Sequence, residues 1–188
     1  MNRLDRLLQD WRIGRAVRFV PPGSRVLDVG CHDGALFRRL GPGLREGIGL
    51  DPALAGTLTG DRYQLLPGAF PADAPREPAS FDAITMLAVL EHVPLDQQPD
   101  LAGAVHRLLK PGGRLILTVP SPRVDTILDG LIRLRLLHGM EAEQHYGFQP
   151  DHVEPLFLGA GLTLVEHTTF QLRLNHLFVF ERPPRTPE

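Results

Sequence analysis

The segment VLDVGCHDG, residues 26–34, places acids and two glycines around a short turn that follows an apolar run. Gly30 and Gly34 let the backbone come close to a ligand, and the helix predicted after them can offer unpaired N–H groups to a carboxylate or a phosphate. A dinucleotide-binding turn needs the series G-x-G-x-x-G, but His32 stands at its second glycine position. Asp28 would also repel a pyrophosphate and attract a cation. The turn therefore favours a ligand that carries a positive charge.

A second acid, Asp51, ends the apolar segment GIGLD at residues 47–51. A carboxylate at the tip of the second strand of a parallel sheet can accept hydrogen bonds from both hydroxyls of a ribose. Together with Asp28, it predicts a pocket for a nucleoside that has no phosphate but carries a positive group. Two simpler roles stay open, because Asp28 could cap its own turn and Asp51, which precedes Pro52, could cap a helix.

Apolar segments of strand length alternate with segments of helical spacing, which is typical of a parallel sheet covered by helices on both faces. We expect strands at 25–30, 46–51, 63–68, 81–89 and 114–120, and two closing strands at 162–170 and 175–182. Helices are expected at 3–19, 34–40, 52–58, 98–110 and 151–160. Ligands of such sheets lie beyond the carboxyl ends of the strands, where both acids are expected. The fold class is therefore doubly wound α/β.

With 188 residues, the chain has the length of a single domain. Residues 1–20 are expected to hold an N-terminal amphipathic helix, and residues 183–188 a disordered tail. Residues 121–150 join a long amphipathic pattern to the polar and aromatic run EAEQHYGFQP, so we expect a lid or substrate-recognition insertion there. Its apolar face could pack on the sheet, cover a hydrophobic acceptor or meet a second subunit as a homodimer.

Four segments follow one another in the order and spacing of a known family. VLDVGCHDG resembles the first motif of the class I S-adenosylmethionine-dependent methyltransferases, GLD their second, FDAITMLAVLEHV their fourth-strand motif, and LLKPGGRLILTVP the segment that enters their fifth strand. The chain is identified as a member of this family, of the type 11 or 12 kind. The resemblance implies a seven-stranded Rossmann-like sheet, mostly parallel with an antiparallel last strand, and S-adenosyl-L-methionine as the cofactor.

The resemblance also implies roles for individual residues. Asp28 would lie near the ammonium of the cofactor, Asp51 would take the ribose hydroxyls, and Leu87 and Ala88 would line the sulfonium. The full set of expected cofactor-binding residues is Asp28, Gly30, Cys31, His32, Gly34, Asp51, Pro52, Ala69, Phe70, Leu87 and Ala88.

Two positions in that set depart from the family pattern. His32 replaces the usual middle glycine, so its side chain lies either over the methionine carboxylate or in solvent. Ala69 stands where the family often has an acid for the adenine amino group, a contact that is then absent or made by the backbone or by Asp73.

Histidines are the candidates for catalysis. His92, in the segment VLEHVP after the fourth expected strand, could remove a proton from a substrate hydroxyl because its ordinary pKa of about 6.5 suits that task. It could equally do no more than fix the loop together with Glu91. His145, in QHYGFQP, is a candidate for substrate contact. No metal site is expected, because His138, His145 and His152 are seven residues apart, whereas helical metal ligands are three or four apart.

Composition limits the partners and the compartment. The net charge is −2 and no basic run occurs, which argues against a nucleic-acid partner. No apolar run reaches the ~20 residues of a membrane span, and the N-terminal segment lacks the apolar centre of a secretory signal. The single cysteine, Cys31, excludes an internal disulfide and agrees with a reducing compartment. We therefore expect a cytoplasmic protein.

These observations predict a methyltransferase that acts on a hydroxyl of a small metabolite, sugar or natural product. The alternatives are an N-methyltransferase and a catalytically degenerate methyltransferase-like binding or scaffold subunit. An NAD-dependent oxidoreductase is disfavoured by the missing glycine series, and RNA methylation is disfavoured by the charge.

Overall fold

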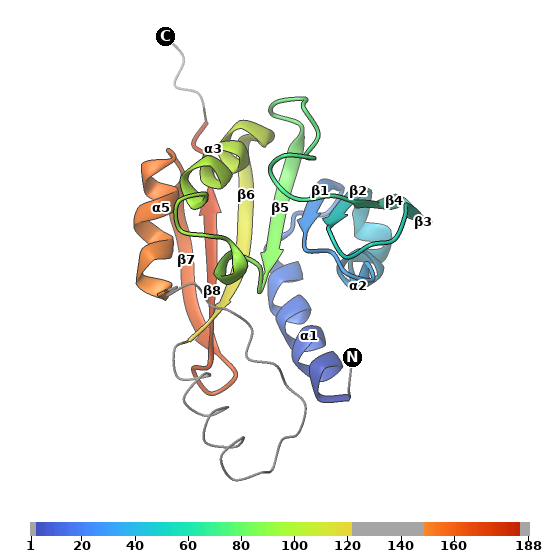
Figure 1. Ribbon diagram of the computed structural model, residues 1–188, viewed down its shortest axis with the longest axis horizontal. Helices are drawn as coiled ribbons and strands as arrows, with labels where there is room; N and C mark the ends of the chain where they lie inside the picture. Colours follow the sequence, from blue (N-terminus) through green and yellow to red (C-terminus); the bar gives the residue numbers. More distant parts are fainter. Residues whose placement is uncertain (1–2, 122–148, 185–188) are drawn as a thin grey trace.

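The computed structural model describes residues 3–121 and 149–184. Eight strands form one sheet in the order β3-β4-β2-β1-β5-β6-β8-β7 (Figure 1). The strands are β1 Ser24–Val29, β2 Leu44–Asp51, β3 Leu58–Gly60, β4 Tyr63–Pro67, β5 Phe81–Leu87, β6 Leu109–Pro120, β7 Thr163–Phe170 and β8 Asn175–Glu181. The pairs from β4 through β2, β1 and β5 to β6 are parallel, whereas β3 and β8 run antiparallel to their neighbours.

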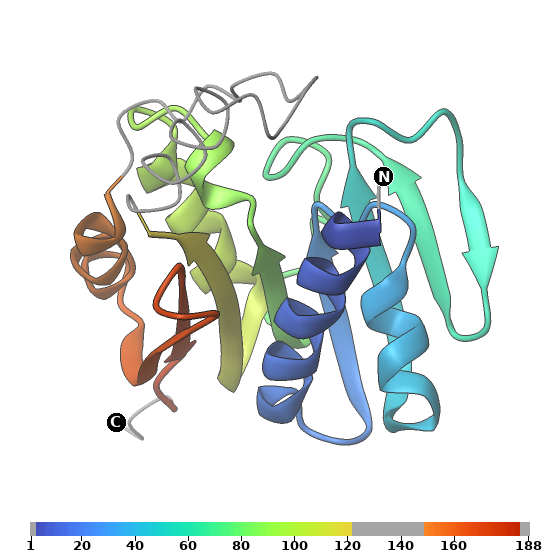
Figure 2. The same ribbon diagram turned by 90° about the horizontal axis from the view of Figure 1, so that it is seen from below.

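In the described part of the chain, four α-helices cover the two faces of the sheet. They are α1 Arg3–Ala16, α2 Ala35–Leu40, α3 Gln98–Leu108 and α5 Val153–Gly159, and 3-10 turns η1 Val17–Phe19, η2 Gly41–Gly43, η3 Leu90–His92 and η4 Pro150–His152 lie between them. Apolar residues of α1 and α2 belong to one buried cluster, and those of α3 and α5 to a second cluster on the opposite face. Figure 2 shows α1 and α2 side by side on their face of the sheet.

The strands of the sheet centre are continuous apolar runs because both of their faces are covered. In β1, residues alternate between the two clusters, with Val26 on the α1 and α2 side and Leu27 and Val29 on the other. This alternation assigns Asp28 to the α1 and α2 side. Thr85 of β5 pairs with Asp28 in the parallel register, so the two polar residues of these buried strands are neighbours.

The doubly wound α/β fold predicted from the sequence is confirmed, and β8, the last strand, is antiparallel as expected. The sheet has eight strands, where seven were expected, because the three-residue strand β3 adds to β4 at the edge. The helix expected at 52–58 is wrong, since that segment forms turns before β3. Its residues are mostly exposed, and a short helix with no apolar face to bury is unstable.

The N-terminal helix ends earlier than expected, because α1 stops at Ala16 and continues only as the 3-10 turn η1. Of the expected insertion at 121–150, residues 122–148 lie outside the described residues, and so do residues 185–188 of the expected tail. No helix in the described part of the chain is long and apolar enough to cross a membrane.

Candidate functional site

The turn after β1 is built by left-handed backbone conformations. Gly30 and Gly34 have φ angles of 73° and 74°, and His32 between them has a φ of 46°. Glycine adopts such angles without cost, whereas histidine does so with strain. Hydrogen bonds from the N–H groups of Gly30 and Cys31 to the carbonyl oxygen of Leu50, at 2.8 and 3.3 Å, anchor the turn on the end of β2. The turn therefore has one fixed shape above the ends of two parallel strands.

Asp28 is buried at the carboxyl end of β1, with 5% of its surface exposed. Its Oδ1 accepts a hydrogen bond of 2.6 Å from the hydroxyl of Thr85. Burial raises the pKa of Asp28 to about 7, the Thr85 hydrogen bond lowers it, and the charge of Asp51 raises it again. The carboxyl group thus has a hydroxyl partner, and a positive charge brought to it would be strongly favoured.

Asp51 ends β2 and holds two backbone groups at once. Its Oδ2 accepts the N–H of His32 at 2.8 Å, and its Oδ1 accepts the N–H of Ala53 at 2.9 Å. The second bond closes a turn after β2, so the capping role that the sequence left open is a turn cap and not a helix cap. A carboxylate has about four acceptor positions, so both oxygens can still accept hydrogen bonds from a ligand. Pro52, beside it, is exposed.

Cys31 faces away from the exposed side of the turn and is 3% exposed. It packs against the backbone of Gly49, where a Cβ atom would lie 2.6 Å from its sulfur. Burial and the charges of Asp28 and Asp51 raise the pKa of the thiol to about 12. Cys31 is therefore a neutral packing residue, which can contribute to a ligand site only through its backbone.

The segment after β4 forms the next part of the same edge. The N–H of Ala69, which is exposed, donates to Asp73 Oδ2 at 2.9 Å, and the N–H of Gly68 donates to the carbonyl oxygen of Asp51 at 3.3 Å. Phe70 is half-buried and packs on the apolar cluster under α3. Position 69 carries no acid itself, but the carboxylate of Asp73 lies next to its backbone N–H.

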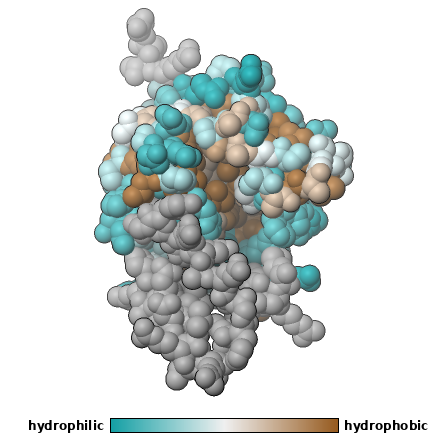
Figure 3. Space-filling model, in the orientation of Figure 1, coloured by the Kyte–Doolittle hydropathy of each residue, from teal (hydrophilic) through white to brown (hydrophobic). Residues whose placement is uncertain are grey.

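The end of β5 lies opposite the glycine turn. Leu87 and Ala88 are half-buried, and Ala88 has a φ of 59°. The side chain of Val89 lies so close to Gly30 that a Cβ there would be 2.5 Å from its Cγ2. The side chain of Val89 therefore leaves room only for glycine at position 30. Figure 3 shows apolar side chains in the middle of the face that carries β5.

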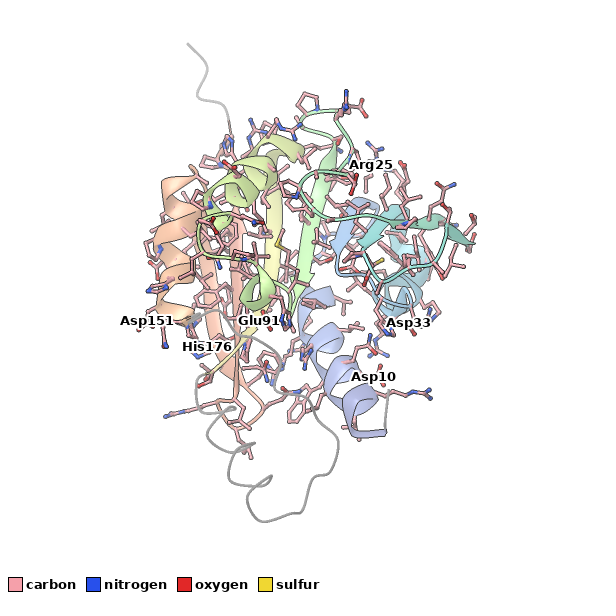
Figure 4. All side chains as sticks on the ribbon, viewed as in Figure 1. Asp10, Arg25, Asp33, Glu91, Asp151 and His176 are labelled. Carbon is pink, nitrogen blue, oxygen red and sulfur yellow. The ribbon has the colours of Figure 1, made fainter. Side chains whose placement is uncertain are left out.

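The candidate catalytic histidines differ in what the structure describes. His92 ends η3, is exposed, and donates its N–H to the carbonyl oxygen of Val89 at 3.0 Å. Glu91 beside it is 2% exposed (Figure 4). His145 lies outside the described residues. His92 is thus on the rim next to the residues expected around the sulfonium.

Two features lie away from this edge. A hollow of about 400 Å³ lies between α5 and β7, lined by Asp151, Glu154, His167, Phe178 and three others, and a smaller one of about 180 Å³ lies at the amino ends of the strands. Neither contains a residue of the glycine turn, whereas ligands of such sheets lie beyond the carboxyl ends of the strands. Residues 3–121 and 149–184 contain no group of three or more histidine, cysteine or acidic side chains that could hold a metal ion.

Sequence reasoning overlooked Thr85 and Val89. Thr85 is the only residue with a hydroxyl in the apolar run FDAITML. Its presence there could have indicated a buried polar partner for Asp28. Val89 carried no signal of its own, because its contact with Gly30 joins segments that are distant in the chain.

Comparisons with known proteins show similarity over most of the chain. Residues 3–167 match the model of a methyltransferase domain family. A ubiquinone biosynthesis O-methyltransferase of Burkholderia thailandensis is 28% identical over 157 residues, which are 77% of this chain and 67% of that protein. A tRNA U34 carboxymethyltransferase of Methylococcus capsulatus is 36% identical over 106 residues, covering 50% of this chain and 32% of that protein.

Among solved structures, the chain resembles one from the Haloferax volcanii complex between the Trm112 methyltransferase activator and a methyltransferase. The TM-score is 0.72 at 18% identity, with 93% of this chain and 88% of that chain covered. At this identity the likeness concerns the fold alone. The chain spans about two thirds of the length of the Burkholderia relative.

Proposed function

Because this chain belongs to the class I S-adenosylmethionine-dependent methyltransferases, we propose that it transfers the methyl group of S-adenosylmethionine to a hydroxyl of a small metabolite, sugar or natural product. The family membership itself makes the protein an enzyme with this cofactor. The observation that carries the site assignment is the pair of buried acids, Asp28 and Asp51, at the carboxyl ends of adjacent parallel strands under a glycine turn. A nucleoside with a cationic amino-acid tail is complementary to that pair.

The residues present fit the cofactor. Asp51 has acceptor capacity for the two ribose hydroxyls beyond its bonds to His32 and Ala53. Asp28 is a buried acid that gains from a nearby ammonium. Gly30 and Gly34 keep side chains away from the methionine part, and Asp73 is beside the backbone expected at the adenine amino group.

The bound cofactor supplies an activated methyl group on a sulfonium. The protein's own contribution is to hold the acceptor hydroxyl in line with that group and to take up its proton. We assign the proton acceptor role to His92, because it is an exposed imidazole on the rim next to Ala88 and Val89. His145 stays a proposal for substrate contact, since it lies outside the described residues.

The hydroxyl acceptor is supported by the relatives whose names specify O-methyltransferases of ubiquinone biosynthesis. The tRNA relative supports a second candidate, modification of RNA, and the net charge of −2 weighs against it. An N-linked acceptor is the third possibility. A cytoplasmic location and a homodimer remain proposals from the sequence.

Calorimetric titration with S-adenosylmethionine and its demethylated product tests the cofactor site. Wild-type protein should bind with micromolar affinity, and Asp51→Ala should weaken binding by about 10-fold or more, because it loses the ribose acceptor and the anchor of the turn. The matched control is Asp61→Ala, whose side chain is 97% exposed in the turn before β4. No binding to folded wild-type protein would contradict the proposal.

Mass spectrometry with panels of hydroxylated, amine and RNA acceptors then tests the acceptor class. A mass gain of one methyl group on hydroxylated acceptors alone is expected. His92→Ala should lower the turnover by about 10²-fold or more without changing cofactor affinity. Turnover of amines but not hydroxyls would move the assignment to N-methylation.

A further inference from the structure

The hydroxyl of Thr85 is the direct partner of the Asp28 carboxyl group. The two residues are opposite each other in β5 and β1, and Thr85 Oγ1 is 2.6 Å from Asp28 Oδ1. The same hydroxyl lies 3.4 Å from the carbonyl oxygen of Leu27, a much weaker contact. Thr85 is fully buried, so no water competes for its hydrogen. This bond therefore fixes the direction in which the carboxyl group points.

Among the described residues, the surroundings of Asp28 supply a hydroxyl and no positive charge that shifts its pKa. Burial raises its pKa to about 7, and of the charged side chains in the described part of the chain only Asp51, on β2, alters it, by raising it further. In the turn above, Cys31 is a neutral thiol and Asp33 is paired with Arg38 at 2.7 Å. His32, in the same turn, points outward with 58% of its side chain exposed. A pKa of about 7 implies that, with no cofactor bound, both the acid and the carboxylate form of Asp28 would occur near neutral pH.

We infer that Thr85 is a positioning residue that directs the Asp28 carboxyl group at the cofactor's ammonium, and that cofactor binding expels a proton from Asp28. The inference rests on the proposed placement of the cofactor. The O–H bond of the carboxylic acid breaks, its electron pair stays on the carboxylate, and the proton goes to solvent. The ammonium keeps all its hydrogens and becomes the counter-charge of the carboxylate.

Proton release makes the affinity for the cofactor depend on pH. The ammonium of the cofactor binds the ionised form of Asp28. The affinity for the cofactor therefore falls as pH decreases through the pKa that Asp28 has when no cofactor is bound. For a group that titrates near pH 7, the dissociation constant at pH 6 is about tenfold larger than at pH 8, and about 0.9 proton is released per cofactor bound at pH 6. An α-amino group titrates near 7.7–8.0, so the informative range lies below pH 7.5.

The experiment is calorimetric titration of the full chain with S-adenosylhomocysteine at pH 6.0, 6.5 and 7.0, in pairs of buffers that differ in ionisation enthalpy. The difference between the two buffers counts the protons released. Wild-type protein should release about 0.9 proton at pH 6.0 and about 0.5 at pH 7.0. Asp28→Asn cannot release this proton, so its count should fall by that amount at each pH.

Variants of Thr85 separate positioning from bulk packing. Thr85→Val keeps the shape but removes the hydroxyl that lowers the pKa of Asp28, so release at pH 7.0 should increase and affinity there should fall about threefold to tenfold. Thr85→Ser restores a hydroxyl and should return the proton count towards the wild-type value. Thr168→Val is the control, because it makes the same substitution at an exposed position of β7. Circular dichroism checks that each variant is folded.

The outcomes separate the inference from the proposed function. Tight binding by wild-type protein with no proton release at pH 6.0, or with the same release in Asp28→Asn, would overturn the inference and leave the methyltransferase site in place. Equal proton counts for Thr85→Val and wild type would overturn the role of Thr85. Absence of any binding to folded wild-type protein would overturn both.

Discussion

Asp28 and Asp82 are aspartates at opposite ends of the sheet, and they have opposite environments. At the amino end of β5, Asp82 receives Lys110 Nζ at 2.6 Å, the N–H of Arg25 at 2.7 Å and the guanidinium of Arg45 at 3.1 Å. Partial burial raises its pKa, but these partners outweigh that effect and its pKa is lowered. At the carboxyl end, Asp28 has a hydroxyl and a second acid nearby, and its pKa is raised to about 7.

The two ends of the sheet differ in the source of the positive charge that an acid needs. Around Asp82, the chain itself supplies the cations. Around Asp28, where a ligand is expected, the described residues supply a hydroxyl and no cation that shifts its pKa, and a cofactor can bring the positive charge. Figure 4 labels Arg25 at the first end and Asp33, in the glycine turn, at the other.

The largest expected effect comes from replacing a glycine with alanine at each end of β1. Gly30→Ala should weaken cofactor binding by about 100-fold or more, because the φ of 73° strains alanine and its Cβ would lie 2.5 Å from Val89. Gly23→Ala has nearly the same φ, 75°, but open space around it, at the start of β1. Calorimetry should show wild-type affinity for Gly23→Ala, whereas thermal unfolding should show a loss of stability in both variants, larger in Gly30→Ala because of its contact with Val89. Equal losses of affinity would remove the distinction between the ends.

Removing the structural acid should cost stability and spare binding. Asp82→Ala leaves the N–H of Arg25 and the ammonium of Lys110 without their acceptor, so urea unfolding at pH 7 should show a loss of about 1–3 kcal/mol. Because the folded pKa of Asp82 is lowered, its stabilising contribution is complete above the unfolded pKa near 3.9 and disappears as pH falls through the folded pKa. The two proteins should therefore converge in stability in strong acid. A change of more than about twofold in cofactor affinity would contradict the separate roles of Asp82 and Asp28.

Neutralising Asp28 should have the opposite effect on stability to removing Asp82. The pKa of Asp28 is raised on folding, so its ionisation destabilises the fold progressively as pH rises from about 4 to about 7. Asp28→Asn does not ionise, so its free energy of unfolding relative to that of wild type should rise over that window by about 3 kcal/mol, and its melting temperature should rise accordingly. The measurement is thermal unfolding without cofactor at pH 4.5, 6 and 7.5. A constant difference at all three pH values would show that Asp28 is ionised throughout.

The strand pattern of the sequence was enough to predict the sheet, because strands buried on both faces are recognisable as continuous apolar runs. The positions of Asp28 and Asp51 at the carboxyl edge of the sheet were also predictable, because the ends of parallel strands must meet at one edge. The turn at 52–57 was missed because Pro52 after an acid looks like a helix start, whereas burial decides whether a short helix forms.

The pairing of Asp28 with Thr85 could not be predicted from local pattern. The two residues are 57 positions apart, and their contact depends on the exact register of β1 against β5. The acceptor side stays a prediction, because the local pattern around an exposed residue such as His92 does not show which substrate atom it would meet.

The hydrogen bond from the N–H of His32 to Asp51 should make position 32 tolerant to mutation. Any residue except proline provides that N–H, and the side chain at this position is 58% exposed, so the contribution of the position lies in its main chain. A family turn that normally carries glycine here can therefore drift to a histidine at the cost of some backbone strain. That side chain can then vary while Asp51 keeps the turn in place.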